Sequence, residues 1–206
     1  MPADNLRESQ TARQLWDEAA ADFDAEADHG LHDERVREAW YVLLQSLTPV
    51  PPACVLDIGC GTGSLTLLLS KMGHTVIGSD FSAQMLAQAQ RKLSSTGYSI
   101  NWIQMDAAFP TLVAGQFDVV LCRHLLWALP QPEKVVKRWR NLLKSDGRLV
   151  LIEGYWHTDA GLHASDILAM LPDGMQATTY PLSDQPDLWG APVSDERYAI
   201  VASGSI

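Results

Sequence analysis

The segment VLDIGCGTGSLTLLL, residues 55–69, places three glycines within five positions between two apolar runs. The first run is typical of a strand that is buried on both faces, and the leucine-rich run after it has helical character. A tight turn normally needs one or two glycines, so Gly59, Gly61 and Gly63 indicate a loop whose main chain a flat ligand can approach closely. In open α/β sheets such ligands bind beyond the carboxyl ends of the strands.

The sequence around this loop alternates short β-rich runs with helical periodicity. Strands are predicted at 54–58, 75–80, 100–106, 117–123 and 148–154. Helices are predicted at 64–72, at 82–93 with Ser82 as N-cap, and from Pro132 through an apolar face that includes Leu143. This repetition predicts a doubly wound α/β fold with a mostly parallel, Rossmann-like sheet and helices on both faces.

The two flanks of this core have weaker patterns. Residues 12–47 are predicted to be helical, and the segment TPVPP ends that region. After the core, a short helix is expected at 164–170 and strands at 176–182 and 197–203, which brings the sheet to about seven strands. Residues 183–196 have the composition of a loop. No repeat or domain boundary interrupts residues 1–206, so a single domain is predicted.

Composition restricts the partners and the location. The net charge of −10 disfavours nucleic acid and anionic lipid as partners. No apolar run reaches the roughly eighteen residues that a membrane span requires, and the N-terminus does not resemble a secretory signal. The three cysteines form no close pair, which favours a reducing, cytoplasmic location. The oligomeric state is left open between monomer and homodimer.

The glycine loop differs from two common nucleotide motifs. A phosphate-binding loop requires a lysine after its last glycine, and none is present. The dinucleotide fingerprint requires glycine at position 64, which is Ser64 here. An NAD-dependent oxidoreductase is therefore retained only as an alternative.

Residues 55–154 closely resemble the class I S-adenosylmethionine-dependent methyltransferases that act on small molecules. The resemblance is carried by VLDIGCGTG, GSDFSAQML, QMDA, FDVVLCRHLLWALPQP and LLKSDGRLVLIEG, in that order. It implies an enzyme that uses S-adenosylmethionine, releases S-adenosylhomocysteine, and methylates N or O of a small aromatic or heterocyclic acceptor. It divides the domain into a helical lid (1–52), a cofactor-binding core (53–154) and C-terminal strands with acceptor-side loops (155–206). A non-catalytic cofactor-binding domain is a further alternative.

The resemblance assigns a set of cofactor-binding residues. Asp80 ends the second strand, where its carboxylate would accept both ribose hydroxyls. Asp57 and the main chain at Gly59 would hold the methionine amino group, and Asp106 with Ala107 would contact the adenine. Cys60 is expected to fill the turn rather than to act as a nucleophile. The predicted cofactor set is Asp57, Gly59, Cys60, Gly61, Gly63, Asp80, Phe81, Met85, Asp106, Ala107 and Arg123.

The acceptor side is predicted from the end of the fourth strand and from the lid. Arg123 and His124 are the candidate catalytic residues, although a structural ion pair for Arg123 and a simply hydrogen-bonded His124 are open alternatives. Many relatives have a His-His-Leu-Pro type of ending here, whereas this chain has Trp127-Ala128-Leu129-Pro130. The predicted acceptor-binding residues are Phe23, His29, His124, Trp127 and Trp156.

Two further expectations concern histidine and tryptophan. His32, His74, His157 and His163 show no metal-ligand spacing, and no metal site is predicted. For Trp16 and Trp40, packing within an amphipathic helix is favoured over a place in the pocket wall.

Overall fold

The computed structural model describes residues 3–94 and 96–204, so the ends of the predicted domain, 1–2 and 205–206, lie outside it. The strands are β1 (Cys54–Ile58), β2 (Thr75–Asp80), β3 (Asn101–Gln104), β4 (Phe117–Arg123), β5 (Leu143–Tyr155), β6 (Gln176–Pro181) and β7 (Glu196–Ser203). The helices are α1 (Ala3–Ala19), α2 (Ala27–Gly30), α3 (Glu34–Leu47), α4 (Ser64–Lys71), α5 (Ala83–Leu93), α6 (Pro132–Leu142), α7 (Ala164–Met170) and α8 (Pro186–Trp189). Two 3₁₀ turns, η1 (Phe23–Ala25) and η2 (Leu126–Ala128), complete the fold.

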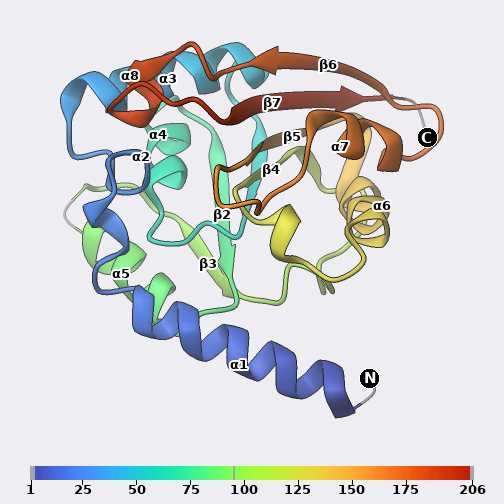
Figure 1. The fold of residues 1–206 in the computed structure, drawn as a ribbon, viewed down its shortest axis with the longest axis horizontal. Helices are drawn as coiled ribbons and strands as arrows, with labels where there is room; N and C mark the ends of the chain where they lie inside the picture. The colour runs from blue at the N-terminus through green and yellow to red at the C-terminus, as the bar shows by residue number, and fades with distance from the viewer. Residues whose placement is uncertain (1–2, 95, 205–206) are drawn as a thin grey trace.

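The strands form one open sheet in the order β3-β2-β1-β4-β5-β7-β6 (Figure 1). The pairs from β3 to β5 are parallel, and β7 runs antiparallel to both of its neighbours. This confirms the predicted doubly wound, mostly parallel sheet. The strand order reverses between β1 and β4, and a crevice is expected at the carboxyl ends of these two strands.

Apolar side chains on the central strands alternate between two cores. Val55 of β1 and Val119 of β4 belong to a core that includes Trp40 and the leucines of α3 and α4. Leu56 and the other alternate positions belong to a second core that includes Trp139 of α6. Each central strand is thus buried on both faces, which explains why its sequence is a continuous apolar run.

Local signals placed several helix ends. Ser82 caps α5, and its hydroxyl accepts a hydrogen bond from the Met85 amide at 3.0 Å. Asp33 caps α3 by accepting from the Arg35 amide at 2.8 Å. Gly73 follows α4 with a φ of 95°, in the left-handed conformation that glycine adopts without strain.

The structure differs from the prediction in four segments. Leu143 opens β5 instead of extending α6, because its buried side chain satisfies a helical and an extended pattern equally well. Residues 183–196, predicted as a loop, contain the single helical turn α8. The predicted helical region 12–47 is divided into α1, η1, α2 and α3. The third strand is shorter than predicted and covers only Asn101–Gln104. The helix α8 was not predicted because a single helical turn is too short for hydrophobic periodicity to detect.

In the part of the chain that the structure describes, no helix has the length and apolar character needed to cross a membrane.

Candidate functional site

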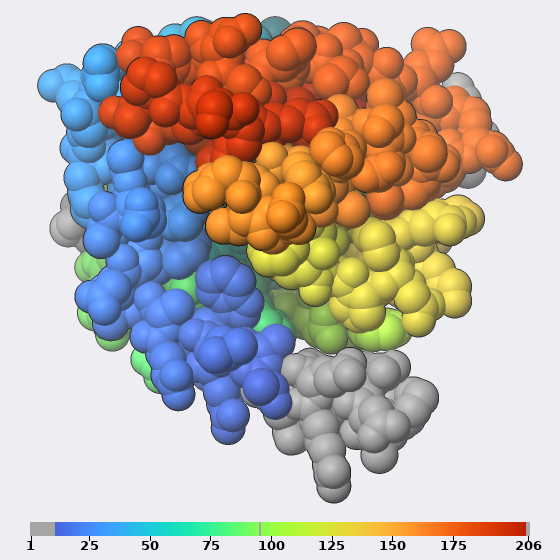
Figure 2. All heavy atoms as spheres, in the orientation of Figure 1, coloured from blue at the N-terminus to red at the C-terminus, as the bar shows by residue number. Residues whose placement is uncertain are grey.

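A cavity of about 460 Å³ opens at the carboxyl ends of β1, β2 and β4. Figure 2 shows the surface hollowed where the blue N-terminal segment meets the yellow and orange segments of the second half of the chain. Of the predicted site residues, the following line the cavity: Phe23, His29, Asp57, Gly59, Cys60, Gly61, Asp80, Phe81, Met85, Asp106, Ala107, Arg123, His124, Trp127 and Trp156.

The glycine loop forms the floor of this pocket. Gly59 and Gly61 have φ angles of 73° and 53°, and a Cβ at Gly59 would collide with the Leu125 side chain. The amides of Gly59 and Cys60 both donate to the Ser79 carbonyl, which fixes the loop to the end of β2. The loop therefore needs glycine for its conformation and for close packing.

Gly63 differs from the other two loop glycines. It does not line the pocket but caps the N-terminus of α4, and a Cβ there would lie 2.9 Å from the ring of Trp102. Its visible role is close packing between α4, α5 and β3, which is not the ligand contact that the sequence predicted. Cys60 is half-buried and lines the pocket, and burial raises the pKa of its thiol well above the usual range, so it is unsuited to act as a nucleophile.

Asp80 ends β2 and faces the pocket. Its Oδ2 accepts from the Gly61 amide at 3.0 Å, and its Oδ1 accepts from the Ser82 amide at 2.9 Å. Each carboxylate oxygen can accept a second hydrogen bond, so both stay available to a ligand. Burial raises the pKa of Asp80 above its ordinary value, which indicates a carboxylate that has lost much of its hydration.

Asp57 lies deeper, at the start of the glycine loop. Its Oδ2 accepts from the Thr66 hydroxyl at 2.5 Å, and the side chain lines the pocket. Burial raises the pKa of Asp57 to about 6, while the Thr66 hydrogen bond and the Arg123 charge oppose this shift. At neutral pH the group is a desolvated carboxylate, which favours a cationic partner.

Asp106 and Ala107 follow β3 on the far side of the pocket. The Asp106 Oδ1 accepts from the Ala108 amide at 2.8 Å, and this bond closes the turn. The Ala107 carbonyl accepts from the Trp139 indole at 2.8 Å, so the core of α6 holds this turn in place. The remaining Asp106 oxygen is therefore presented by a fixed backbone.

The segment from η1 to α2 closes over the glycine loop. Asp24 accepts from the Thr62 hydroxyl at 2.5 Å and forms an ion pair with Lys92 of α5 at 2.7 Å. Lys92 also donates to the Thr62 and Ser64 hydroxyls, at 3.0 and 2.9 Å. The Phe23 ring lies above Gly61 and stacks on His29 with centroids 4.3 Å apart. These contacts attach the predicted lid to the cofactor-binding core.

We expect the change Lys92→Met to loosen the lid while leaving the fold intact. The Lys92–Asp24 pair is partly buried, and its loss should lower the free energy of lid opening by about 1 kcal/mol. Amide hydrogen exchange across residues 20–30 should then become roughly fivefold faster. Lys137→Met, which removes an exposed pair with Glu133 on α6, is the matched control and should leave that exchange unchanged. Equal amide exchange rates across residues 20–30 in the two variants would show that Lys92 does not hold the lid closed.

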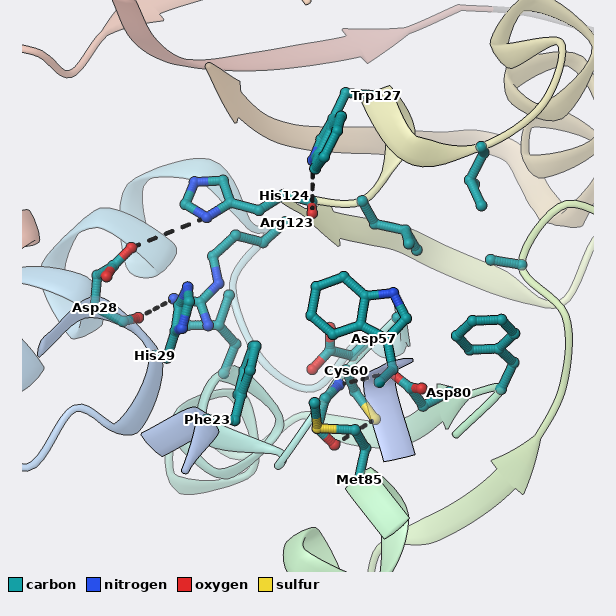
Figure 3. Close-up of a pocket in the computed structure, with 18 of the residues that line it drawn as sticks. Phe23, Asp28, His29, Asp57, Cys60, Asp80, Met85, Arg123, His124 and Trp127 are labelled. Carbon is teal, nitrogen blue, oxygen red and sulfur yellow. Dashed lines mark hydrogen bonds and ion pairs between the residues drawn. The ribbon is translucent and has the colours of Figure 1, made fainter. Parts of the chain in front are cut away.

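Arg123 ends β4 beside the lid, and His124 follows it directly. The Arg123 guanidinium donates to the main-chain carbonyl of Asp28, which joins β4 to α2. His124 has a φ of 53°, and its Nδ1 lies 3.9 Å from the Asp28 carboxylate. Burial, and then the Arg123 charge, lowers the pKa of both His29 and His124. Figure 3 shows Asp28, His29 and His124 together on one side of the pocket, with Asp80 and Met85 on the other.

Glu153 of β5 supports this end of β4 from behind the pocket wall. Its Oε1 accepts from the Leu125 amide at 2.9 Å and from the Leu126 amide at 2.7 Å. These bonds fix the turn in which His124 adopts its left-handed conformation. Glu153 is fully buried, and burial raises its pKa to about 8.

The acceptor end of the pocket is aromatic. Trp127 and Trp156 pack edge to face with ring centroids 5.5 Å apart. Arg197 lies over Trp156 and forms a two-point ion pair with Asp195, at 2.8 and 3.2 Å. Flat apolar surface with a few polar groups is typical of a small-molecule site.

The structure also places residues in the pocket that the sequence interpretation missed. Trp16 lines the pocket, which is the less favoured of the two roles considered for it, whereas Trp40 is fully buried in the core as predicted. Asp28 and Arg197 reach the site from α2 and β7 without any local motif. The one available signal was the position of Asp28 beside His29 in the predicted lid.

Comparisons with known proteins agree with this geometry. Residues 56–151 match the methyltransferase domain family. Over 126 residues the chain is 32% identical to a ubiquinone biosynthesis O-methyltransferase of Coxiella burnetii, an alignment that covers 58% of this chain and 53% of that protein. The chain thus spans about half the length of the curated relatives it matches.

Solved structures share the fold. A magnesium protoporphyrin IX methyltransferase from Synechocystis PCC 6803, with S-adenosylmethionine bound, is 25% identical with a TM-score of 0.61, over 94% of this chain and 80% of that one. A (4+2)-cyclase is 18% identical with a TM-score of 0.70, over 82% and 81% of the two chains, so the fold alone does not specify the reaction. The ordered motifs, the match of residues 56–151 to the methyltransferase domain family and the sheet topology together support a class I S-adenosylmethionine-dependent methyltransferase, the family that this chain resembles.

Proposed function

We propose that this protein transfers a methyl group from S-adenosylmethionine to an oxygen or nitrogen of a small aromatic or heterocyclic acceptor. The observation that carries the proposal is the convergence of the Gly59–Gly61 main chain, Asp57, Asp80 and Asp106 on one cavity. The family match supports the reaction class, and the two methyltransferases named above are a ubiquinone biosynthesis O-methyltransferase and a magnesium protoporphyrin IX methyltransferase.

The residues present fit the cofactor. Asp80 keeps acceptor capacity on both carboxylate oxygens for a pair of ribose hydroxyls. Asp57 is a desolvated carboxylate suited to the methionine ammonium group. Met85 and Phe81 supply apolar surface beside Asp106, where a purine ring and its amino group would lie. When bound, S-adenosylmethionine supplies a methyl group already activated by the sulfonium.

The task of the chain is then mainly to position the two reactants. The Phe23 ring of the lid covers the glycine loop at Gly61, and the Arg123 hydrogen bond holds the lid to the end of β4. His124 and His29 face the space between the loop and the aromatic end, where an acceptor atom would approach the methyl group. Trp127 and Trp156 would hold the acceptor ring, so proximity supplies a large part of the rate enhancement.

Isothermal titration with S-adenosylmethionine, S-adenosylhomocysteine and NAD tests the proposal. Binding of the first two and not of NAD is expected, and methyl transfer from labelled S-adenosylmethionine to a panel of phenols, catechols and heterocyclic amines should then identify an acceptor. Failure to bind either sulfur compound would overturn the proposal. Cofactor binding without transfer to any acceptor would instead favour a binding domain. A cytoplasmic location, a monomeric or homodimeric state, and the absence of nucleic-acid and membrane partners remain predictions.

A further inference from the structure

Three donor side chains converge at the boundary between the loop side and the aromatic side of the pocket. One ligand-type atom from each of Asp28, His29 and His124 lies within 4.8 Å of the other two. All three residues line the cavity or its wall, and all three are largely shielded from solvent. Their atoms come from α2 and from the end of β4, two elements that the Arg123 contact holds together.

The environment of His124 determines which nitrogen faces this cluster. Its Nε2 is buried without a hydrogen-bond partner, and its ring packs edge to face with Trp156 (ring centroids 5.3 Å apart) and stacks on Trp189 (ring centroids 6.0 Å apart). A neutral imidazole carries one proton, and a proton on the enclosed Nε2 leaves Nδ1 as the donor atom for a ligand. The lone pair is then on Nδ1, which is directed at the Asp28 carboxylate (Figure 3).

The Arg123 guanidinium is the positive charge beside the cluster, and it donates to the Asp28 main-chain carbonyl and not to the carboxylate. The 3.9 Å between the His124 Nδ1 and the Asp28 Oδ2 is too long for a hydrogen bond. The His29 Nδ1 is also buried without a partner. Two imidazoles and a carboxylate that face the same small volume are the donor set typical of a transition-metal site with open coordination positions.

The charge of the pocket wall is consistent with a cation. Acidic side chains outnumber basic ones on the lining, and the acidic ones are Glu26, Asp28, Asp57, Asp80 and Asp106, against Arg123 and Arg197. S-adenosylmethionine carries one net positive charge, so this excess of three negative charges is offset only in part by the cofactor. A divalent ion would neutralise the remainder.

We propose that Asp28, His29 and His124 bind a divalent transition-metal ion of the zinc type, whose open position takes an oxygen of the acceptor. This inference rests on the proposed methyl transfer and narrows it to a hydroxyl acceptor. Coordination lowers the pKa of a bound hydroxyl, and its proton leaves through the pocket mouth to solvent. The oxygen then forms the new O–CH₃ bond as the S–CH₃ bond breaks, and the electron pair of that bond stays on sulfur. The inference replaces the earlier expectation of no metal site.

Cobalt(II) is the probe for this site, because four- or five-coordinate Co²⁺ bound through nitrogen and oxygen absorbs visible light more strongly than the hydrated ion. The 206-residue chain, saturated with S-adenosylhomocysteine, should bind one equivalent of Co²⁺ with this absorption, and Zn²⁺ should displace it. His29→Ala and His124→Ala should each lower the metal affinity by at least about 100-fold. His163→Ala is the matched control, because that ring pairs with Glu196 outside the pocket and should leave the affinity unchanged.

Two further measurements separate metal binding from folding and from cofactor binding. Asp28→Asn is a nearly isosteric variant that should fold normally and still lose most of the metal affinity. Thermal unfolding of each variant shows whether it is folded. An absence of the cobalt spectrum in the wild-type chain, or equal losses in His163→Ala and His29→Ala, would overturn the metal site. Loss of the metal site with S-adenosylhomocysteine binding retained leaves the proposed function standing. Failure to bind S-adenosylhomocysteine overturns the proposed function and the role of the metal in methyl transfer, whereas the cobalt spectrum tests the metal site itself.

Discussion

Asp80→Ala is expected to weaken S-adenosylhomocysteine binding by roughly 100-fold or more. The carboxylate is placed to accept two ligand hydroxyls, and each hydrogen bond to a charged group is worth about 1.5–3 kcal/mol. A total of about 3 kcal/mol corresponds to a factor of roughly 100 in Kd. Isothermal titration measures this change directly.

Two companion variants make the result specific to the ribose contact. Asp80 also accepts from the amides of Gly61 and Ser82, so its removal disturbs the loop as well as the ligand site. Asp80→Asn retains one carbonyl acceptor and should give an intermediate affinity. Asp146→Ala removes an exposed carboxylate of β5 and should bind like the wild type. An unchanged affinity in Asp80→Ala would remove the assigned role.

Glu153→Gln is expected to change how stability depends on pH. The pKa of Glu153 is raised from 4.5 to about 8 in the folded chain, so between these values the folded state holds a proton that the unfolded state has released. The free energy of unfolding therefore falls as pH rises through this window. One pKa unit corresponds to about 1.4 kcal/mol, so between pH 6 and pH 8 the wild type should lose about 2–3 kcal/mol relative to the variant.

Urea unfolding at a series of pH values measures this difference. The glutamine side-chain oxygen can still accept from the Leu125 and Leu126 amides, so the turn that carries His124 should persist. Glu38→Gln, at an exposed position of α3, should follow the wild-type curve. If the wild type and Glu153→Gln show parallel pH profiles, then Glu153 ionises normally in the folded protein and the buried protonated form is refuted.

The candidate site was predictable where its residues follow directly from strand ends. Asp57, Asp80 and Asp106 come at or just after β1, β2 and β3, and parallel strands bring their carboxyl ends to one edge of the sheet. Gly63 shows the limit of this reasoning, because a motif position can serve helix packing as well as a ligand. Trp16 is a second example. Its helical spacing could not show that this side chain faces the pocket, because spacing does not tell which face of a helix lines a cavity.

The sequence by itself determined the sheet, its parallel core and the glycine loop, because apolar runs and turn residues act over a few neighbouring positions. Only the tertiary structure decided that Asp28 lies beside His124, that Arg197 reaches the aromatic end, and that Glu153 supports the β4 turn. These residues are separated by many positions and carry no shared period. Their proximity arises from sheet order and lid closure, so no local pattern could encode it.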